Sequence, residues 1–210
     1  MGDLIILTGF EPFGGEKINP SWESVKDFDG MVFNGFNIKT LRLPVSYKRA
    51  KEKVEEIIGE MKPLVFLSFG EAGGRTKIFV ERVALNLMDS DKADNDGYKV
   101  KGELIYKDAP LAYFSNLPVN KIVNNLQKNG IPAKVSNHAG TYVCNLVFYT
   151  ALHHSTIINL ETKVGFIHVP YAFEQVMKKD KPAFPLEYIK KAVKIIIESI
   201  VSDLKDDSNH

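Results

Sequence analysis

This chain of 210 residues lacks both a charge imbalance and a long apolar run. Its 27 basic and 26 acidic side chains leave a formal net charge of +1. A near-neutral chain offers no electrostatic footprint for nucleic acid or for an anionic membrane surface. No stretch reaches the ~18 consecutive apolar residues that a membrane span requires. We therefore expect no nucleic-acid partner and no membrane association, and a small ligand fits better.

Cysteine is nearly absent, because Cys144 is the single thiol in the chain. One cysteine cannot form an internal disulfide, and secreted proteins more often carry an even number of cysteines. The N-terminal segment 1–7 also lacks the basic leader of a signal peptide and runs directly into a strand-like pattern. These features predict a cytoplasmic location.

Apolar segments with strand-like and helical spacing alternate along the whole chain. The pattern predicts strands at residues 4–7, 37–44, 64–70, 78–86, 133–136 and 164–169. Helices are expected at residues 47–61, 118–129, 141–153 and 186–204, with a short helix capped by Ser21. This alternation predicts a single-domain α/β/α sandwich over residues 1–210, with a mixed, mostly parallel, open twisted sheet. The polar residues 206–210 are expected to form a frayed tail.

Cys144 follows a turn of small residues between an expected strand and an expected helix. A position in the first helical turn would place its thiol beside unpaired backbone N–H groups and partial positive charge. Both would favour a thiolate and lower the thiol pKa, and the same N–H groups could hold an oxyanion. Free cysteines are nevertheless mostly buried and inert. From this segment alone, a structural cysteine is the favoured interpretation.

Two other residues could supply the chemistry that a catalytic thiol needs. His168, between Ile167 and Val169 near the end of a strand, would emerge at the sheet edge where ligands gather in open α/β folds. Glu81 lies in an otherwise apolar strand, where a buried acid needs a partner. A satisfied core histidine and a plain ion pair between Glu81 and Arg82 explain the same residues about equally well.

Several other segments offer weaker signals. His153 and His154 lack companion ligands at metal spacing, so a solvated pair and no metal site are expected. The Gly-rich loops at 9–15 and 70–75 match neither a dinucleotide fingerprint nor a P-loop. Phe10 and Phe13 are unusual in such a loop, and they either tuck into the core or line a flat apolar pocket.

Taken together, five segments resemble the pyroglutamyl peptidases of type I, also called pyrrolidone carboxyl peptidases. Each match is modestly specific, but they occur in the order of that family over nearly the whole chain. The matching segments are Gly9–Gly15 with Asn19-Pro20, Gly70–Arg75, Glu81–Asn86, Ser136–Asn145 and Phe166–Tyr171.

The resemblance implies a cytoplasmic hydrolase that removes an N-terminal pyroglutamyl residue from peptides. It implies a catalytic triad of Cys144, His168 and Glu81, and no metal or cofactor. It also implies an open α/β/α sandwich and a homo-oligomer, commonly a homotetramer. The residues implied to bind the substrate's pyroglutamyl ring are Phe10, Phe13, Asn19, Glu71, Tyr142 and Val143, with Glu71 meeting the lactam through its backbone.

The chain departs from the family pattern at two places. Position 71 is Glu where Gln is expected in many relatives, so a side-chain contact there would weaken affinity or make it pH-dependent. The acidic segment 89–91 stands where an arginine is expected near Asp91, and Lys92 is a candidate second oxyanion donor.

Two alternatives from other functional classes stay open at this point. One is a small-molecule-binding or phosphorylase-type protein that holds an anion in the Gly-rich loops, which predicts insensitivity to thiol alkylation. The other is an inactive relative that serves as an interaction module, which is expected if the departures at Glu71 and Asp91 destroy the site.

Overall fold

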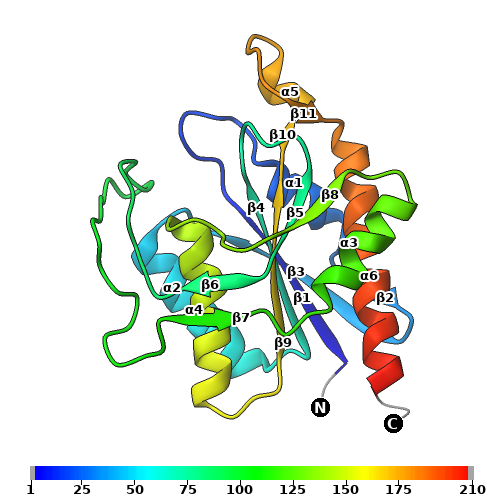
Figure 1. Cartoon of the computed structure of the whole chain (residues 1–210), viewed down its shortest axis with the longest axis horizontal. Coiled ribbons are helices and arrows are strands. Elements are labelled where there is room, and N and C mark those ends of the chain that lie inside the picture. Colours follow the sequence, from blue (N-terminus) through cyan, green and yellow to red (C-terminus); the bar gives the residue numbers. More distant parts are fainter. Residues whose placement is uncertain (1–2, 208–210) are drawn as a thin grey trace.

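The computed structural model describes residues 3–207, and a seven-stranded sheet lies at its centre (Figure 1). The strand order is β2-β3-β1-β4-β9-β5-β8. Four neighbouring pairs are parallel, whereas β2–β3 and β5–β9 are antiparallel. The strands are β1 Leu4–Phe10, β2 Val32–Phe33, β3 Phe36–Leu43, β4 Val65–Glu71, β5 Ile78–Glu81, β8 Ala133–Ser136 and β9 Lys163–Val169. The predicted mixed, mostly parallel sheet is confirmed.

Helices cover both faces of this sheet, which confirms the three-layer architecture (Figure 1). One face packs against α1 Pro20–Val25, α3 Val119–Lys128 and α6 Leu186–Asp207. The other face packs against α2 Tyr47–Glu56, which continues as the π-helical turn η2 Ile57–Met61, and against α4 Val143–Ile157. Because side chains alternate along a strand, β4 and β9 contribute to both apolar layers.

The predicted strand 78–86 divides into two strands that belong to different sheets. The chain leaves the main sheet at Arg82, whose N–H donates to Ser136 O at 2.7 Å and whose carbonyl accepts from Ser115 N at 2.8 Å. Strand β6 Val83–Leu85 then pairs with β7 Ala112–Phe114. Strand-forming apolar residues stand on both sides of Glu81 and Arg82, so the sequence pattern did not show the change of partner.

Several predicted boundaries need correction. Asn19, not Ser21, caps α1, since Asn19 Oδ1 accepts from Ser21 N at 3.1 Å and Pro20 opens the helix. Helix α4 begins at Val143 rather than at residue 141. The final helix extends through Asp207, so residues 206 and 207 are helical rather than frayed, and 208–210 lie outside the described residues.

Short elements that the sequence did not indicate complete the chain. They are η1 Lys26–Phe28, β2, β7, and the protruding β10 Tyr171–Ala172, α5 Phe173–Val176 and β11 Ala183–Phe184. The polar segment 89–97 is exposed or half-buried except at Asp94, which is 7% exposed. Within residues 3–207, no helix is long and apolar enough to cross a membrane.

Candidate active site

Strands β5 and β9 bring a carboxylate and an imidazole together on the sheet face that α4 covers. Their antiparallel register pairs Phe79 with His168 and Glu81 with Phe166, so Glu81 is the diagonal neighbour of His168. Long side chains at such diagonal positions can touch. His168 Nδ1 and Glu81 Oε1 are 2.8 Å apart, and the two residues are 4% and 0% exposed.

Arg75 completes the surroundings of this carboxylate, and the sequence had not assigned it a role. Its Nη1 donates to Glu81 Oε1 at 3.0 Å. Arg82, the expected ion-pair partner, instead directs its guanidinium to Asn120 and Asn137, at 3.4 and 3.3 Å. Consecutive strand residues point to opposite faces, so adjacent Glu81 and Arg82 could not have paired there. The alternation rule alone could have excluded Arg82.

The charge state of the pair follows from the balance of burial and partners. Burial raises the pKa of Glu81, but the hydrogen bond from His168 and the charge of Arg75 outweigh it and leave that pKa lowered. Burial also lowers the pKa of His168, and the Glu81 carboxylate offsets this only in part. A carboxylate accepts only, so we assign the proton of neutral His168 to Nδ1, which leaves Nε2 as a base.

Cys144 lies in the first turn of α4, as expected. The helix start is fixed by the fully buried Asn145, whose Oδ1 accepts from Leu85 N at 2.9 Å. Asn145 Nδ2 donates to the carbonyls of Leu85 and Leu87 at 2.8 and 3.0 Å. The first backbone N–H groups of a helix have no carbonyl inside it to bond. Those around Cys144 are therefore suited to receive a negatively charged oxygen.

Gly70, near the end of β4, lies beside both Cys144 and His168. Gly70 is the register partner of His168 across β4 and β9. A Cβ atom at Gly70 would lie 2.9 Å from Cys144 Sγ, so only glycine lets the sulfur approach the strand this closely. Cys144 and His168 line one open cavity of about 260 Å³. The thiol and the base therefore face the same space.

The pKa of Cys144 differs from the expectation for a helix start. Burial, followed by the charges of Glu81 and Glu71, raises the pKa of the thiol to about 12, and Arg75 opposes this only in part. The expected lowering of this pKa is wrong for the ligand-free protein. Desolvation and two nearby carboxylates outweigh the partial charge of the helix start.

A second, narrow cavity of about 30 Å³ adjoins the thiol. All six residues expected around the ring line it together with Cys144 and Val45. The rings of Phe13 and Tyr142, which both line the cavity, pack in a tilted arrangement with centroids 6.3 Å apart. Val45 was missed because it follows the end of β3 outside the recognised motifs.

The two polar residues of this pocket direct their side chains to the protein. Asn19 Nδ2 donates to Glu11 O at 3.0 Å, and its Oδ1 accepts from Ser21 Oγ at 2.7 Å. Glu71 Oε2 accepts from Gln175 Nε2 at 2.7 Å. Burial raises the pKa of Glu71 to about 7, and the Gln175 hydrogen bond opposes this only in part.

The remaining candidates lie in different settings. Asp91 is 93% exposed at its side chain and pairs with Lys101 Nζ at 2.5 Å. Lys92 is exposed at the rim of the larger cavity. The expectation of a solvated histidine pair is wrong for His153, which is 8% exposed and whose Nδ1 lies 3.0 Å from the Tyr113 hydroxyl.

Comparisons with known proteins identify the family of the chain. A family model described as pyroglutamyl peptidase matches residues 3–203. Pyrrolidone-carboxylate peptidase of Thermococcus kodakarensis is 46% identical over 200 residues, which cover 95% of this chain and 97% of that protein. The relative of the same name from Thermococcus onnurineus is 48% identical over 195 residues, or 93% and 97% of the two chains.

A solved structure gives the same answer for the fold. Pyrrolidone carboxyl peptidase from Thermococcus litoralis superposes with a TM-score of 0.94 at 40% identity, and the match covers 97% of this chain and 96% of that one. The match of the family model and the identity to these relatives extend over almost the whole chain. The chain therefore belongs to the pyroglutamyl peptidase family of cysteine peptidases.

Proposed function

We propose that this protein hydrolyses the amide bond after an N-terminal pyroglutamyl residue of peptides, with Cys144 as nucleophile, His168 as base and Glu81 as the group that orients the base. The observation that carries the proposal is the convergence of Cys144 and His168 on one cavity, with Glu81 Oε1 2.8 Å from the far nitrogen of the imidazole. A nucleophile, a base and an orienting group arranged in this order are what nucleophilic catalysis requires.

Acylation begins when the substrate carbonyl enters the cavity. His168 Nε2 takes the proton from Cys144 Sγ, and the sulfur attacks the pyroglutamyl carbonyl carbon. The resulting oxyanion is held by N–H groups at the start of α4. His168 then gives the proton to the leaving amine nitrogen, the C–N bond breaks, and a thioester to Cys144 remains.

Deacylation uses the same base in the reverse direction. His168 Nε2 takes a proton from a water molecule, whose oxygen attacks the thioester carbon. The C–S bond breaks, pyroglutamate leaves, and the proton returns to the sulfur. A positioned base contributes about 10²–10⁴-fold to such steps.

The raised pKa of Cys144 defines when the thiolate forms. Burial and the charges of Glu81 and Glu71 raise the pKa of the thiol to about 12, which favours the protonated thiol at neutral pH. The proton therefore moves to His168 as the attack takes place rather than in the resting state. Glu81, kept ionised by Arg75 and His168, stabilises the imidazolium that forms.

Selection of the pyroglutamyl ring follows from the chemistry of the narrow pocket. Phe10, Phe13 and Val143 provide an apolar lining beside Cys144. A lactam has no charged amine, whereas the ammonium of an ordinary N-terminus would be buried there without a partner. Backbone groups at Glu71 are proposed to meet the lactam, because its carboxylate is turned to Gln175.

The proposal also covers a second oxyanion donor, the location of the protein and its assembly. Lys92 is the proposed second oxyanion donor because it lies at the rim of the cavity that holds Cys144 and His168. A cytoplasmic location suits a catalytic thiol that must stay reduced. A single catalytic domain is proposed from the alternation of strands and helices along the chain, and a homotetramer is proposed from the family resemblance.

A chromogenic pyroglutamyl amide tests the proposal directly. The native protein is expected to release the chromophore, and Cys144→Ser is expected to lose nearly all of this activity. The matched prolyl amide, which carries an ammonium in place of the lactam, is expected to be a poor substrate. No turnover by the native protein, or full turnover by Cys144→Ser, would contradict the proposal.

A further inference from the structure

Glu11 lies in the segment between two residues that line the narrow pocket, although Glu11 itself does not line it. It follows Phe10 and precedes Phe13 by two residues, and both phenylalanines line the pocket. Its backbone N–H donates to Leu43 O at 2.9 Å, and its carbonyl accepts from Asn19 Nδ2 at 3.0 Å. The main chain of Glu11 is therefore held from both sides.

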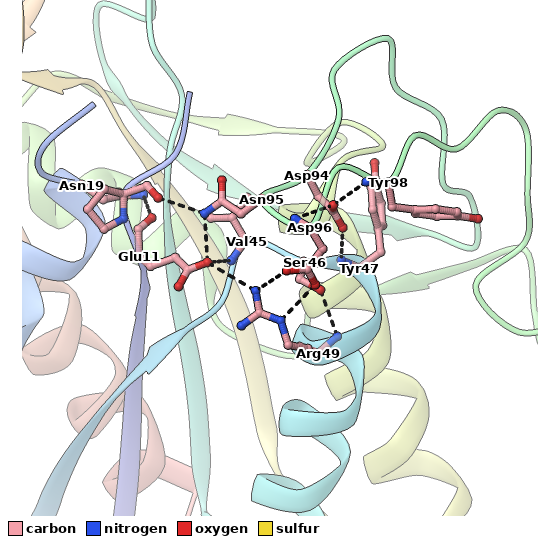
Figure 2. Close-up of polar contacts among 11 residues, drawn as sticks. Glu11, Asn19, Val45, Ser46, Tyr47, Arg49, Asp94, Asn95, Asp96 and Tyr98 are labelled. Atoms are coloured by element: carbon pink, nitrogen blue, oxygen red, sulfur yellow. Dashed lines mark hydrogen bonds and ion pairs between the residues drawn. The ribbon is translucent and has the colours of Figure 1, made fainter. Parts of the chain in front are cut away.

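The side chain of Glu11 ties this wall to two further segments (Figure 2). Its Oε1 accepts from the backbone N–H of Val45 at 3.0 Å and from Asn95 Nδ2 at 2.9 Å. Arg49 Nη2 lies 3.8 Å from the same oxygen. The carboxylate is 28% exposed, so these charge-assisted bonds are partly shielded from water. One oxygen thus joins three loops, including the one that carries the pocket residue Val45.

Asn95 also bonds to the two segments that the Glu11 side chain joins. Its backbone N–H donates to Val45 O at 2.8 Å, and its Nδ2 donates also to Pro12 O at 3.0 Å. Figure 2 shows Asn95 above Glu11 and Val45, with its side-chain amide directed at the Glu11 carboxylate and the adjacent carbonyl. The loop around Asn95 is therefore bonded to both the Glu11 segment and the Val45 segment of the pocket wall.

The neighbouring Asp94 and Ala93 join the same loop to the opposite wall. Asp94, which is buried, accepts from the backbone N–H groups of Tyr47 and Tyr98 with both carboxylate oxygens, each at 2.9 Å. The hydroxyl of the pocket residue Tyr142 donates to Ala93 O at 2.9 Å. The loop thereby spans from the Glu11 side of the pocket to the Tyr142 side.

We propose that Glu11 is a positioning residue that sets the width and shape of the ring pocket, through Val45 and the loop at 93–98. This inference rests on the proposed function, because it assigns the narrow pocket to the pyroglutamyl ring. The catalytic groups are held by other contacts, namely those of Arg75 with Glu81 and of Asn145 with β6. Loss of Glu11 therefore acts on binding of the ring and leaves the chemical step in place.

The experiment measures KM and kcat for a chromogenic pyroglutamyl amide, and Ki for free pyroglutamate, in four variants. Glu11→Ala is expected to raise KM and Ki about tenfold, the scale of one charge-assisted hydrogen bond, with kcat within about twofold of native. Glu11→Gln keeps an oxygen acceptor for Val45 N and Asn95 Nδ2, so it is expected to stay within about threefold of native.

Of the other two variants, one changes the partner Asn95 and the other is a control in the same loop as Glu11. Asn95→Asp replaces the donor with a carboxylate facing Glu11, and it is expected to raise KM at least as much as Glu11→Ala. Glu16→Ala removes a carboxylate of the same loop, which is ion-paired with Lys179 rather than with the pocket walls. Its KM and Ki are expected to lie within about twofold of native. Circular dichroism establishes that each variant is folded.

The outcomes separate this inference from the function on which it rests. No turnover by the native protein overturns the proposed function and this inference with it. Native turnover with unchanged KM and Ki in both Glu11→Ala and Asn95→Asp overturns the inference alone. A fall in kcat at constant KM also overturns it. Should Glu11→Ala fail to fold, Asn95→Asp and Glu11→Gln decide the question.

Discussion

Two carboxylates at the ends of strands near the thiol lie in opposite electrostatic settings. Glu81 accepts from Arg75 and lies 2.8 Å from His168 Nδ1, and its pKa is lowered although it is fully buried. Glu71 is bonded to the neutral amide of Gln175, and burial raises its pKa to about 7. Burial raises both pKa values, so the difference between the two acids follows from the partners that oppose burial.

This contrast has a chemical meaning for the site. In the proposed mechanism, an ionised Glu81 fixes the His168 tautomer and balances the imidazolium during attack. A Glu71 that is largely protonated below pH 7 adds little negative charge beside Cys144. The charges of Glu81 and Glu71 each raise the pKa of the Cys144 thiol. Of these two acids, only Glu81, which is proposed to orient the base, stays ionised at all working pH values.

The largest expected effect comes from making the same change at both carboxylates. Glu81→Gln should lower kcat about 10²–10⁴-fold, because the amide cannot hold the imidazolium and favours no single tautomer. Glu71→Gln should leave kcat/KM near neutral pH within about threefold. Steady-state kinetics with a pyroglutamyl amide checks both, and equal losses in the two variants would remove the distinction.

The second effect is on stability as a function of pH. The folded-state pKa of Glu71 is raised from 4.5 to about 7, so its contribution to stability is full below pH 4.5 and is lost as the pH rises through 7. Glu71→Gln should therefore gain about 1–3 kcal/mol relative to native between pH 5 and pH 8. Urea unfolding at the two pH values measures this, and a gain at pH 5 only would contradict it.

Removing the Arg75 cation should make the electrostatic setting of Glu81 more like that of Glu71. Arg75 lowers the pKa of Glu81 and of His168, so Arg75→Gln should raise both. The acid limb of kcat/KM against pH then moves to higher pH, with about a tenfold loss at pH 6. Arg82→Gln is the matched control, because Arg82 contacts Asn120 and Asn137. An identical pH profile for native and Arg75→Gln would be inconsistent with the role of Arg75.

The smallest expected effect concerns the thiol itself. The Glu71 charge raises the pKa of Cys144, so Glu71→Gln should speed alkylation of the thiol by iodoacetamide at pH 8 by about threefold. The rate is followed by intact mass, since the chain has one cysteine. A slower reaction in the variant would contradict the assigned influence of Glu71.

The sequence was informative where local pattern and spatial arrangement coincide. Buried strands such as β4 and β9 and the position of Cys144 at a helix start follow from periodicity and turn residues. The family resemblance selected the residues of the triad and the narrow pocket. The packing of Gly70 against Cys144 had no local signal, because it depends on two elements 74 positions apart meeting.

Other features depended on long-range electrostatics and pairing. The pairing of Glu81 with Arg75 required the fold, although strand alternation already argued against Arg82. The raised pKa of Cys144 reverses the helix-based expectation, since burial and the two carboxylates become visible only in three dimensions. The hydrogen bonds of Asn95 to Glu11 and Pro12 had no signal in the sequence, because Asn95 lies in a polar loop.

The central claim is that Cys144 is the nucleophile of a pyroglutamyl peptidase. Its most direct test is the turnover of a chromogenic pyroglutamyl amide by Cys144→Ala and by native protein with a known fraction of alkylated thiol. We expect no turnover by folded Cys144→Ala and a native rate that falls in proportion to the alkylated fraction. Undiminished turnover by Cys144→Ala would contradict it.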